Sequence, residues 1–123
     1  MASNKDLACY ISWSKTHPVL AVGTEKGSLV FFNRKSQRKI PCIAKHGKKV
    51  VDGDWNNDGF LISCSLDKML TVSNHQGDTP FDTHIVKGEP SNLLWSPATD
   101  EALKVLCCIT GAGAKIFRFN PKT

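Results

Sequence analysis

The sequence has 123 residues, of which 41% are hydrophobic, and it carries a formal net charge of +5 at pH 7. This length and apolar fraction are typical of one globular unit with a modest core, and they argue against disorder. No run of about 18 apolar residues is present, so no transmembrane helix is expected, and residues 1–6 lack the apolar segment of a secretory signal.

The first predicted unit extends over about residues 7–45. Apolar and polar residues alternate at its start, so four apolar side chains are expected on one strand face: Leu7, Cys9, Ile11 and Trp13. Gly27 supplies the positive φ of a hairpin turn, and Pro41 confines the last strand to the edge of a sheet. The expected strands are residues 7–13, 20–23, 29–33 and 38–44.

The second predicted unit extends over about residues 46–88 and repeats this order. Its residues Asn57, Asp58 and Gly59 form one of the strongest short hairpin signals. The inner segments are almost wholly apolar, as is typical of strands buried between stacked sheets. The expected strands are residues 50–55, 60–65, 69–74 and 81–87.

The third predicted unit extends over about residues 89–123, with a loop at residues 97–101. Gly111 and Gly113 lack the third glycine and the following helix of a dinucleotide site, so they indicate a turn. The expected strands are residues 91–96, 104–110 and 114–120.

Three tryptophans, Trp13, Trp55 and Trp95, recur at the same point of the three units. A repeat of about forty residues that holds four strands is typical of a β-propeller blade. We therefore predict an all-β chain of about three four-stranded antiparallel blades, in which these tryptophans are packing anchors between blades. Because propellers typically need four to eight blades, the ring is not closed and the chain is interpreted as part of a larger propeller.

Basic residues are concentrated between Lys26 and Val51, where no Asp or Glu occurs. Such a block attracts an anionic partner, and the candidate patch consists of Arg34, Lys35, Arg38, Lys39, Lys45, Lys48 and Lys49. The alternative is a solvated rim of turns and edge strands, in which lysine discourages aggregation. The block has no aromatic residue after Phe32 on which bases could stack, which disfavours nucleic acid.

The sequence offers little for catalysis or metal binding. Its five cysteines have no Cys-x-x-Cys spacing and mostly lie in or beside apolar segments, which indicates buried free thiols. The four histidines lack the short ligand spacing of a zinc site. A pairing of Cys107 or Cys108 with His46 or His84 is conceivable, but nothing in the apolar strand lowers the thiol pKa. We predict no enzymatic activity, no metal and no cofactor.

Three carboxylates, Asp52, Asp54 and Asp58, cluster near Trp55. A polar strand end is the favoured interpretation of this cluster, and a cation site is the alternative.

The second unit resembles a WD repeat. His46 lies where that family places its Gly-His pair, and Ser63 and Asp67 lie in a match to its Ser-x-Ser-x-Asp segment. In the family, a His, a Ser or Thr, an Asp and a Trp form a buried hydrogen-bond network in each blade. The resemblance therefore implies a structural network of His46, Ser63 and Asp67, whereas Ser73 takes the place of the Trp and cannot supply an indole.

Longer motifs narrow the resemblance. They are similar to part of the N-terminal propeller of one subunit family of intraflagellar transport complex A, whose members are named for a nominal mass of one hundred and forty-four kilodaltons. The matching motifs are residues 13–15, 20–24, 38–41, 67–74 and 89–92. Members of that family carry further blades and a helical solenoid, so the resemblance implies that this chain is a fragment.

The resemblance also implies a function. We expect a non-catalytic protein–protein interaction scaffold in retrograde ciliary transport and cilium assembly, on the cytoplasmic side of the cilium or flagellum and its basal body. Its partners would be other complex A subunits and ciliary cargo adaptors, with no small-molecule substrate and at most peripheral membrane contact. Two alternatives stay open: a generic WD-repeat adaptor of another complex, and binding of anionic lipid or nucleic acid through residues 26–51.

Overall fold

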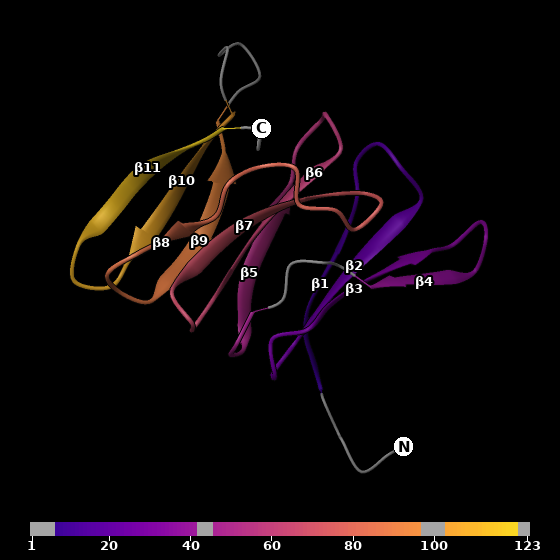
Figure 1. Cartoon of the computed structure of the whole chain (residues 1–123), viewed down its shortest axis with the longest axis horizontal. Helices are drawn as coiled ribbons and strands as arrows, with labels where there is room; N and C mark the ends of the chain where they lie inside the picture. Colours follow the sequence, from indigo (N-terminus) through magenta and orange to yellow (C-terminus); the bar gives the residue numbers. More distant parts are fainter. Residues whose placement is uncertain (1–6, 42–45, 97–102, 121–123) are drawn as a thin grey trace.

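The computed structural model describes residues 7–41, 46–96 and 103–120. Its strands form three antiparallel sheets that stack face to face along the chain (Figure 1). The first sheet has the order β1 (Ala8–Trp13), β2 (Val19–Thr24), β3 (Leu29–Asn33) and β4 (Arg38–Pro41). The second has β5 (Val50–Trp55), β6 (Phe60–Ser65), β7 (Met69–Asn74) and β8 (His84–Ile85) in the same order. The third consists of β9 (Pro90–Trp95), β10 (Leu103–Ile109) and β11 (Gly113–Phe119), with β10 in the middle.

This architecture confirms the prediction of an all-β, partial propeller whose ring is not closed. One outer strand is shorter than predicted, because β8 pairs with β7 only at His84 and Ile85 instead of along residues 81–87. The last residues of the predicted outer strand of the first sheet, 42–44, and the predicted loop at 97–101 lie outside the described residues.

The innermost strand of each sheet carries one extra residue at an equivalent place. The extra residues are Cys9, Val51 and Asn92, at which the register shifts between β1 and β2, β5 and β6, and β9 and β10, respectively. Each is a β-bulge, which breaks the alternation of side chains along the strand. The prediction that Cys9 shares a face with Ile11 and Trp13 is therefore wrong. All three residues are exposed, but Cys9 Sγ donates to the carbonyl of Val50 in the second sheet, at 3.1 Å.

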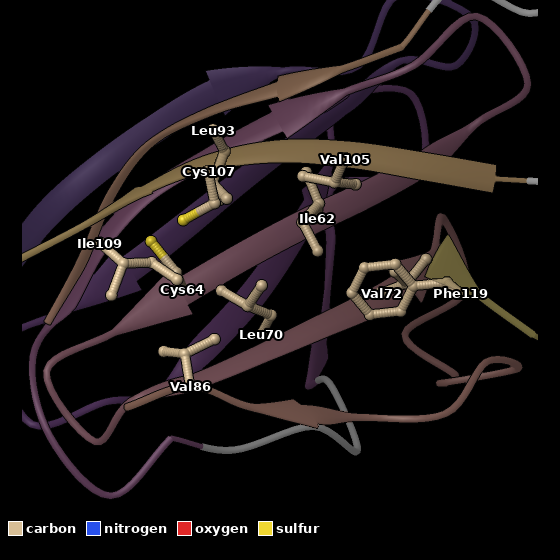
Figure 2. Packing of buried hydrophobic residues seen from close by; sticks show 10 residues of the cluster. All are labelled: Ile62, Cys64, Leu70, Val72, Val86, Leu93, Val105, Cys107, Ile109 and Phe119. Carbon is tan, nitrogen blue, oxygen red and sulfur yellow. The ribbon is translucent and has the colours of Figure 1, made fainter. Parts of the chain in front are cut away.

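Two hydrophobic cores lie between the sheets. The first core joins Val19, Ala21, Leu29 and Phe31 of the first sheet to Val50, Trp55 and Leu61 of the second. The second core, shown in Figure 2, contains Ile62, Cys64, Leu70, Val72, Val86, Leu93, Val105, Cys107, Ile109 and Phe119. The second sheet is thus covered on both faces, and each fully buried large apolar side chain stabilises the stack by about 1.5–3 kcal/mol.

The turn between β2 and β3 approaches the second sheet closely. Gly27 has a φ of 99°, and its carbonyl accepts a hydrogen bond from the His46 amide at 3.0 Å. A side chain at this position would collide with the backbone of His46 and Lys48. Glycine is therefore required both by the backbone conformation and by the contact.

Candidate functional site

The indoles of Trp55 and Trp95 form the same contact between successive sheets. Trp55 Nε1 donates to the carbonyl of Ser12 at 3.1 Å, and Trp95 Nε1 donates to the carbonyl of Asp54 at 2.6 Å. Ser12 and Asp54 each immediately precede the tryptophan of their own strand. Each indole therefore ties one innermost strand to the innermost strand of the preceding sheet.

Burial separates Trp13 from the other two tryptophans. Trp55 is 1% exposed and its ring lies 5.3 Å from that of Phe31, whereas Trp13 is 52% exposed. Among the described residues, the structure gives the Trp13 indole no hydrogen-bond partner. The predicted packing role therefore stays a prediction for Trp13, because its face of the first sheet has no neighbouring sheet in the described chain.

The register extends this open face across the first sheet. Trp13 pairs with Leu20, and Leu20 with Phe32, so the three side chains form one row across β1, β2 and β3. A second row is formed by Ile11, Val22 and Val30. The face is apolar and unpartnered in the described structure.

The structure brings His46, Ser63 and Asp67 together in the second sheet. His46 Nε2 lies 3.1 Å from Ser63 Oγ, and His46 Nδ1 lies 3.2 Å from Asp67 Oδ2. Asp67 also accepts hydrogen bonds from the amides of Gly47 at 2.7 Å and Met69 at 3.0 Å. The carboxylate therefore joins the segment before β5 to the turn between β6 and β7.

Sequence reasoning missed the fourth member of this network. Thr71 Oγ1 lies 2.9 Å from Ser63 Oγ and 3.4 Å from His46 Nε2. The predicted hairpin could have identified Thr71, because this residue is the cross-strand partner of Ser63 in the register of β6 and β7. Ser73, at the position where the family has its Trp, is fully buried, and its hydroxyl has no hydrogen-bond partner among the residues that the structure describes.

Burial determines the charge state of His46. Desolvation lowers the pKa of this imidazole below its ordinary value, although the neighbouring Asp67 carboxylate acts in the opposite direction. A neutral ring with one N–H and one acceptor nitrogen suits the partners that surround it. The arrangement is that of a structural hydrogen-bond network.

The two carboxylates of β5 are used as acceptors between sheets. Asp52 Oδ2 accepts the amide of Leu93 at 2.9 Å, and Asp54 Oδ2 accepts the amide of Trp95 at 3.3 Å. Both amides belong to β9, the edge strand of the third sheet, so these bonds satisfy donors that do not pair within that sheet. In the described part of the chain, no group of three or more His, Cys, Asp or Glu side chains is arranged to hold a metal ion.

The thiols and histidines considered for catalysis are placed separately. Cys64 and Cys107 are buried in the second core, where Figure 2 shows their sulfur atoms pointing toward one another. Burial raises the pKa of both thiols, which disfavours the nucleophilic thiolate. His46 uses both ring nitrogens in its own network, and His84 Nε2 lies 2.7 Å from the carbonyl of Arg118. Cys9 and Cys108 are exposed, so the prediction of buried thiols is wrong for these two. Cys42 lies outside the described residues.

The predicted basic patch is divided between the two ends of the strands. Arg34 and Lys35 follow the end of β3, and Arg38 and Lys39 begin β4, next to the loop between β1 and β2. The second group, Lys48 and Lys49, precedes β5 beside the turn between β2 and β3, because His46 bonds to Gly27 there. A six-residue strand separates the two ends by about 20 Å, and Lys45 lies outside the described residues. The patch is therefore not one continuous surface.

A pocket of about 640 Å³ lies at the first of these ends. The loop between β1 and β2 and the residues after β3 surround it, and its lining includes Trp13, Lys15, His17, Arg34 and Lys35. Of these, Lys15 and His17 were not part of the predicted patch.

The described part of the chain contains no apolar helix of membrane-spanning length.

Comparison with known proteins gives one family. Residues 2–114 match the family described as the WDR19 first beta-propeller. The mouse WD repeat-containing protein 19 is 45% identical over 100 residues, which are 80% of this chain and 7% of that protein. The WD repeat-containing protein dyf-2 of Caenorhabditis elegans is 33% identical over 91 residues, which are 74% of this chain and 6% of that protein.

Solved structures share the fold at much lower identity. The computationally designed Ika4 protein has a TM-score of 0.73 and 12% identity, over 90% of this chain and 65% of that one. The WD40 domain of Neurospora crassa Pan2 has a TM-score of 0.62 and 13% identity, over 98% of this chain and 40% of that one. At such identities the likeness concerns the fold alone.

Proposed function

This chain belongs to the WDR19 first beta-propeller family. On that premise we propose that it forms part of a protein-docking surface of an intraflagellar transport complex A subunit. In this proposal the chain acts without catalysis, in retrograde ciliary transport and cilium assembly. The observation that carries the proposal is the family match across residues 2–114. The family and the fold together make the chain a piece of a WD-repeat propeller with a scaffold architecture.

The use of the polar side chains supports a scaffold. His46 and Asp67 are bonded within their blade, and Asp52 and Asp54 are bonded to the next one. These groups hold sheets together, so the surfaces left for partners are loops and outer sheet faces. Repeat proteins usually bind their partners through such surfaces, which a rigid framework of packed repeats holds in place.

The partners in this proposal are other complex A subunits and ciliary cargo adaptors, met on the cytoplasmic side of the cilium and at its basal body. The chain spans about 7% of the length of the curated relatives that it matches. The activity and partners of the whole protein therefore belong to the proposal.

The test uses the tagged product of the gene in ciliated cells, with an unrelated tagged propeller as the control. We expect co-purification with complex A subunits and a signal along cilia and at basal bodies, neither of which the control gives. Co-purification with a different assembly and absence from cilia would contradict the ciliary assignment. That outcome would favour the generic adaptor.

A further inference from the structure

The hairpin of β3 and β4 lies at the outer edge of the first sheet. β4 is the last strand of that sheet and pairs with β3 alone. The main contacts between successive sheets are made elsewhere, by β1 with β5 and by β5 and β6 with β9. Figure 1 shows the β3–β4 turn projecting from the stack of sheets. In a ring of such sheets the faces meet and the outer edges form the rim, so this turn stays open when neighbouring blades are present.

Ser36 lies in this turn and is the one exposed serine of residues 7–41, 46–96 and 103–120; the other serines there are partly or fully buried. Asn33 shapes the turn, because its Oδ1 accepts the amides of Lys35 at 2.9 Å and Ser36 at 3.1 Å. Its carbonyl accepts the amide of Gln37 at 2.7 Å. These bonds use backbone amides, so the turn forms without the Ser36 hydroxyl.

Cations flank this serine on both sides. Arg34 and Lys35 precede it, and Arg38 and Lys39 follow it after one neutral residue. All four are exposed, and no Asp or Glu occurs in residues 26–51. The serine therefore supplies the one hydroxyl group of an exposed segment in which every charge is positive.

The fold does not require this composition. The turn after β7 is built in the same way, because Asn74 Oδ1 accepts the amides of Gln76 at 2.9 Å and Asp78 at 3.0 Å. Yet residues 75–78 contain no serine, lysine or arginine. Lysine on an edge strand discourages aggregation, which accounts for part of the charge in the first hairpin but not for the exposed hydroxyl among four cations.

A hydroxyl in these surroundings suits a protein kinase. Kinases select a substrate partly by the pattern of charges around the acceptor, and an acidic substrate groove favours cations on both sides of it. β4 has four residues and one pairing partner, so the turn can detach locally from the sheet and enter such a groove at low cost.

We propose that Ser36 is a phosphorylation site for a serine/threonine kinase that recognises basic residues. In the transfer, Ser36 Oγ bonds to the γ-phosphorus of ATP and the bond from that phosphorus to the β,γ-bridging oxygen breaks. ADP leaves, and the hydroxyl proton passes to the catalytic aspartate of the kinase. This inference goes beyond the proposed scaffold function and does not depend on the ciliary assignment.

The flanking cations also give the modification a consequence. A phosphoserine carries a charge of about −1.5 to −2 and forms charge-assisted hydrogen bonds with neighbouring arginine and lysine. Phosphorylation of Ser36 therefore neutralises part of the charge at this rim, and the turn attracts other anionic groups less strongly.

The test incubates the purified chain with Mg²⁺, ATP and the catalytic domain of protein kinase C, which selects serines between basic residues. We expect a single phosphate, located on Ser36 by tandem mass spectrometry. S36A should lose this phosphate, whereas S36T should keep it because the kinase also accepts a threonine hydroxyl. Casein kinase 2, which selects acidic surroundings, should leave Ser36 unmodified.

Two matched quadruple variants separate local recognition from general charge. R34Q/K35Q/R38Q/K39Q should lower kcat/KM for Ser36 at least about tenfold, which is about 1.4 kcal/mol. K48Q/K49Q/K87Q/K115Q removes the same charge from exposed residues elsewhere and should change kcat/KM less than about twofold. All the replaced side chains are exposed, and far-ultraviolet circular dichroism checks that each variant is folded.

Several results would overturn the assignment. They are phosphate found only on other residues, equal kcat/KM in the two quadruple variants, and equally fast modification of Ser36 by casein kinase 2. A peptide of residues 31–42 that is phosphorylated while the folded chain is not would also overturn it, because the fold would then withhold the hydroxyl.

Discussion

Trp13 and Trp55 are a matched pair for measuring what an indole between sheets contributes to stability. Both end the innermost strand of their sheet, but Trp55 is 1% exposed and Trp13 is 52% exposed. Replacing Trp55 by Ala removes the contact with Phe31 and leaves the Ser12 carbonyl without its donor. Replacing Trp13 by Ala removes an indole that contacts no neighbouring sheet among the described residues.

The expected magnitudes differ clearly. Truncating a buried Trp to Ala costs about 3–5 kcal/mol, of which loss of the hydrogen bond is about 1 kcal/mol. W13A should cost less than about 1 kcal/mol because the side chain is half exposed. A small domain has a total stability of about 5–15 kcal/mol, so W55A removes a large part of it.

Urea unfolding followed by far-ultraviolet circular dichroism measures the difference. With a slope of about 1–3 kcal/mol per molar urea, W55A should lower the midpoint by about 1 M or more at an unchanged slope, and W13A by much less. Equal losses in the two variants would refute the reasoning. If those equal losses also depended on protein concentration, Trp13 would be covered by another molecule in solution.

Three further outcomes are expected. Burial lowers the pKa of His46 and of His75, and the charge of His17 also lowers that of His75. The unfolded chain therefore takes up protons before the folded chain as pH falls below about 6.5. The urea midpoint should decrease from pH 7.5 to pH 5.5, and the decrease should be less steep in H46Q. Burial raises the pKa of Tyr10, the one tyrosine of the chain, to about 12, so its stabilising contribution is present below pH 10 and is lost above it. Absorbance at 295 nm should therefore show no tyrosine ionisation in the folded chain at pH 10.5. Ordinary titration of the tyrosine near pH 10 would contradict the burial. S73A removes a buried hydroxyl that has no partner in the described part of the chain and should be neutral or stabilising. S63A breaks the network and should cost about 1–3 kcal/mol. Thermal unfolding of the two variants checks the contrast, and equal losses would contradict it.

The sequence predicted the strands well because strand formation here depends on local chemistry. The Asn57-Asp58-Gly59 turn, the glycine at Gly27 and the alternation of apolar residues act over a few neighbouring positions. The β-bulge at Cys9 was not predictable in this way. It depends on how β1 registers against β2 and on the bond from Cys9 to the next sheet, neither of which the local pattern contains.

In the candidate site, too, some features follow from the sequence and others depend on strand pairing. The WD-repeat resemblance named His46, Ser63 and Asp67, which the structure places within hydrogen-bonding distance, but Thr71 entered the network only through strand pairing. The basic block is continuous in sequence and divided in space, because antiparallel strands carry successive loops to opposite ends of a sheet.

By itself, the sequence determined the all-β character, the repeat and the equivalent places of the three tryptophans. Only the tertiary structure decided that Trp55 is buried while Trp13 is open, and that Lys15 joins Arg34 and Lys35 in one pocket. The physical reason is that the local pattern fixes which residues form a strand and, away from β-bulges, on which face of the strand each side chain lies. Its burial and its charged neighbours are fixed by the sheet or loop that happens to lie opposite.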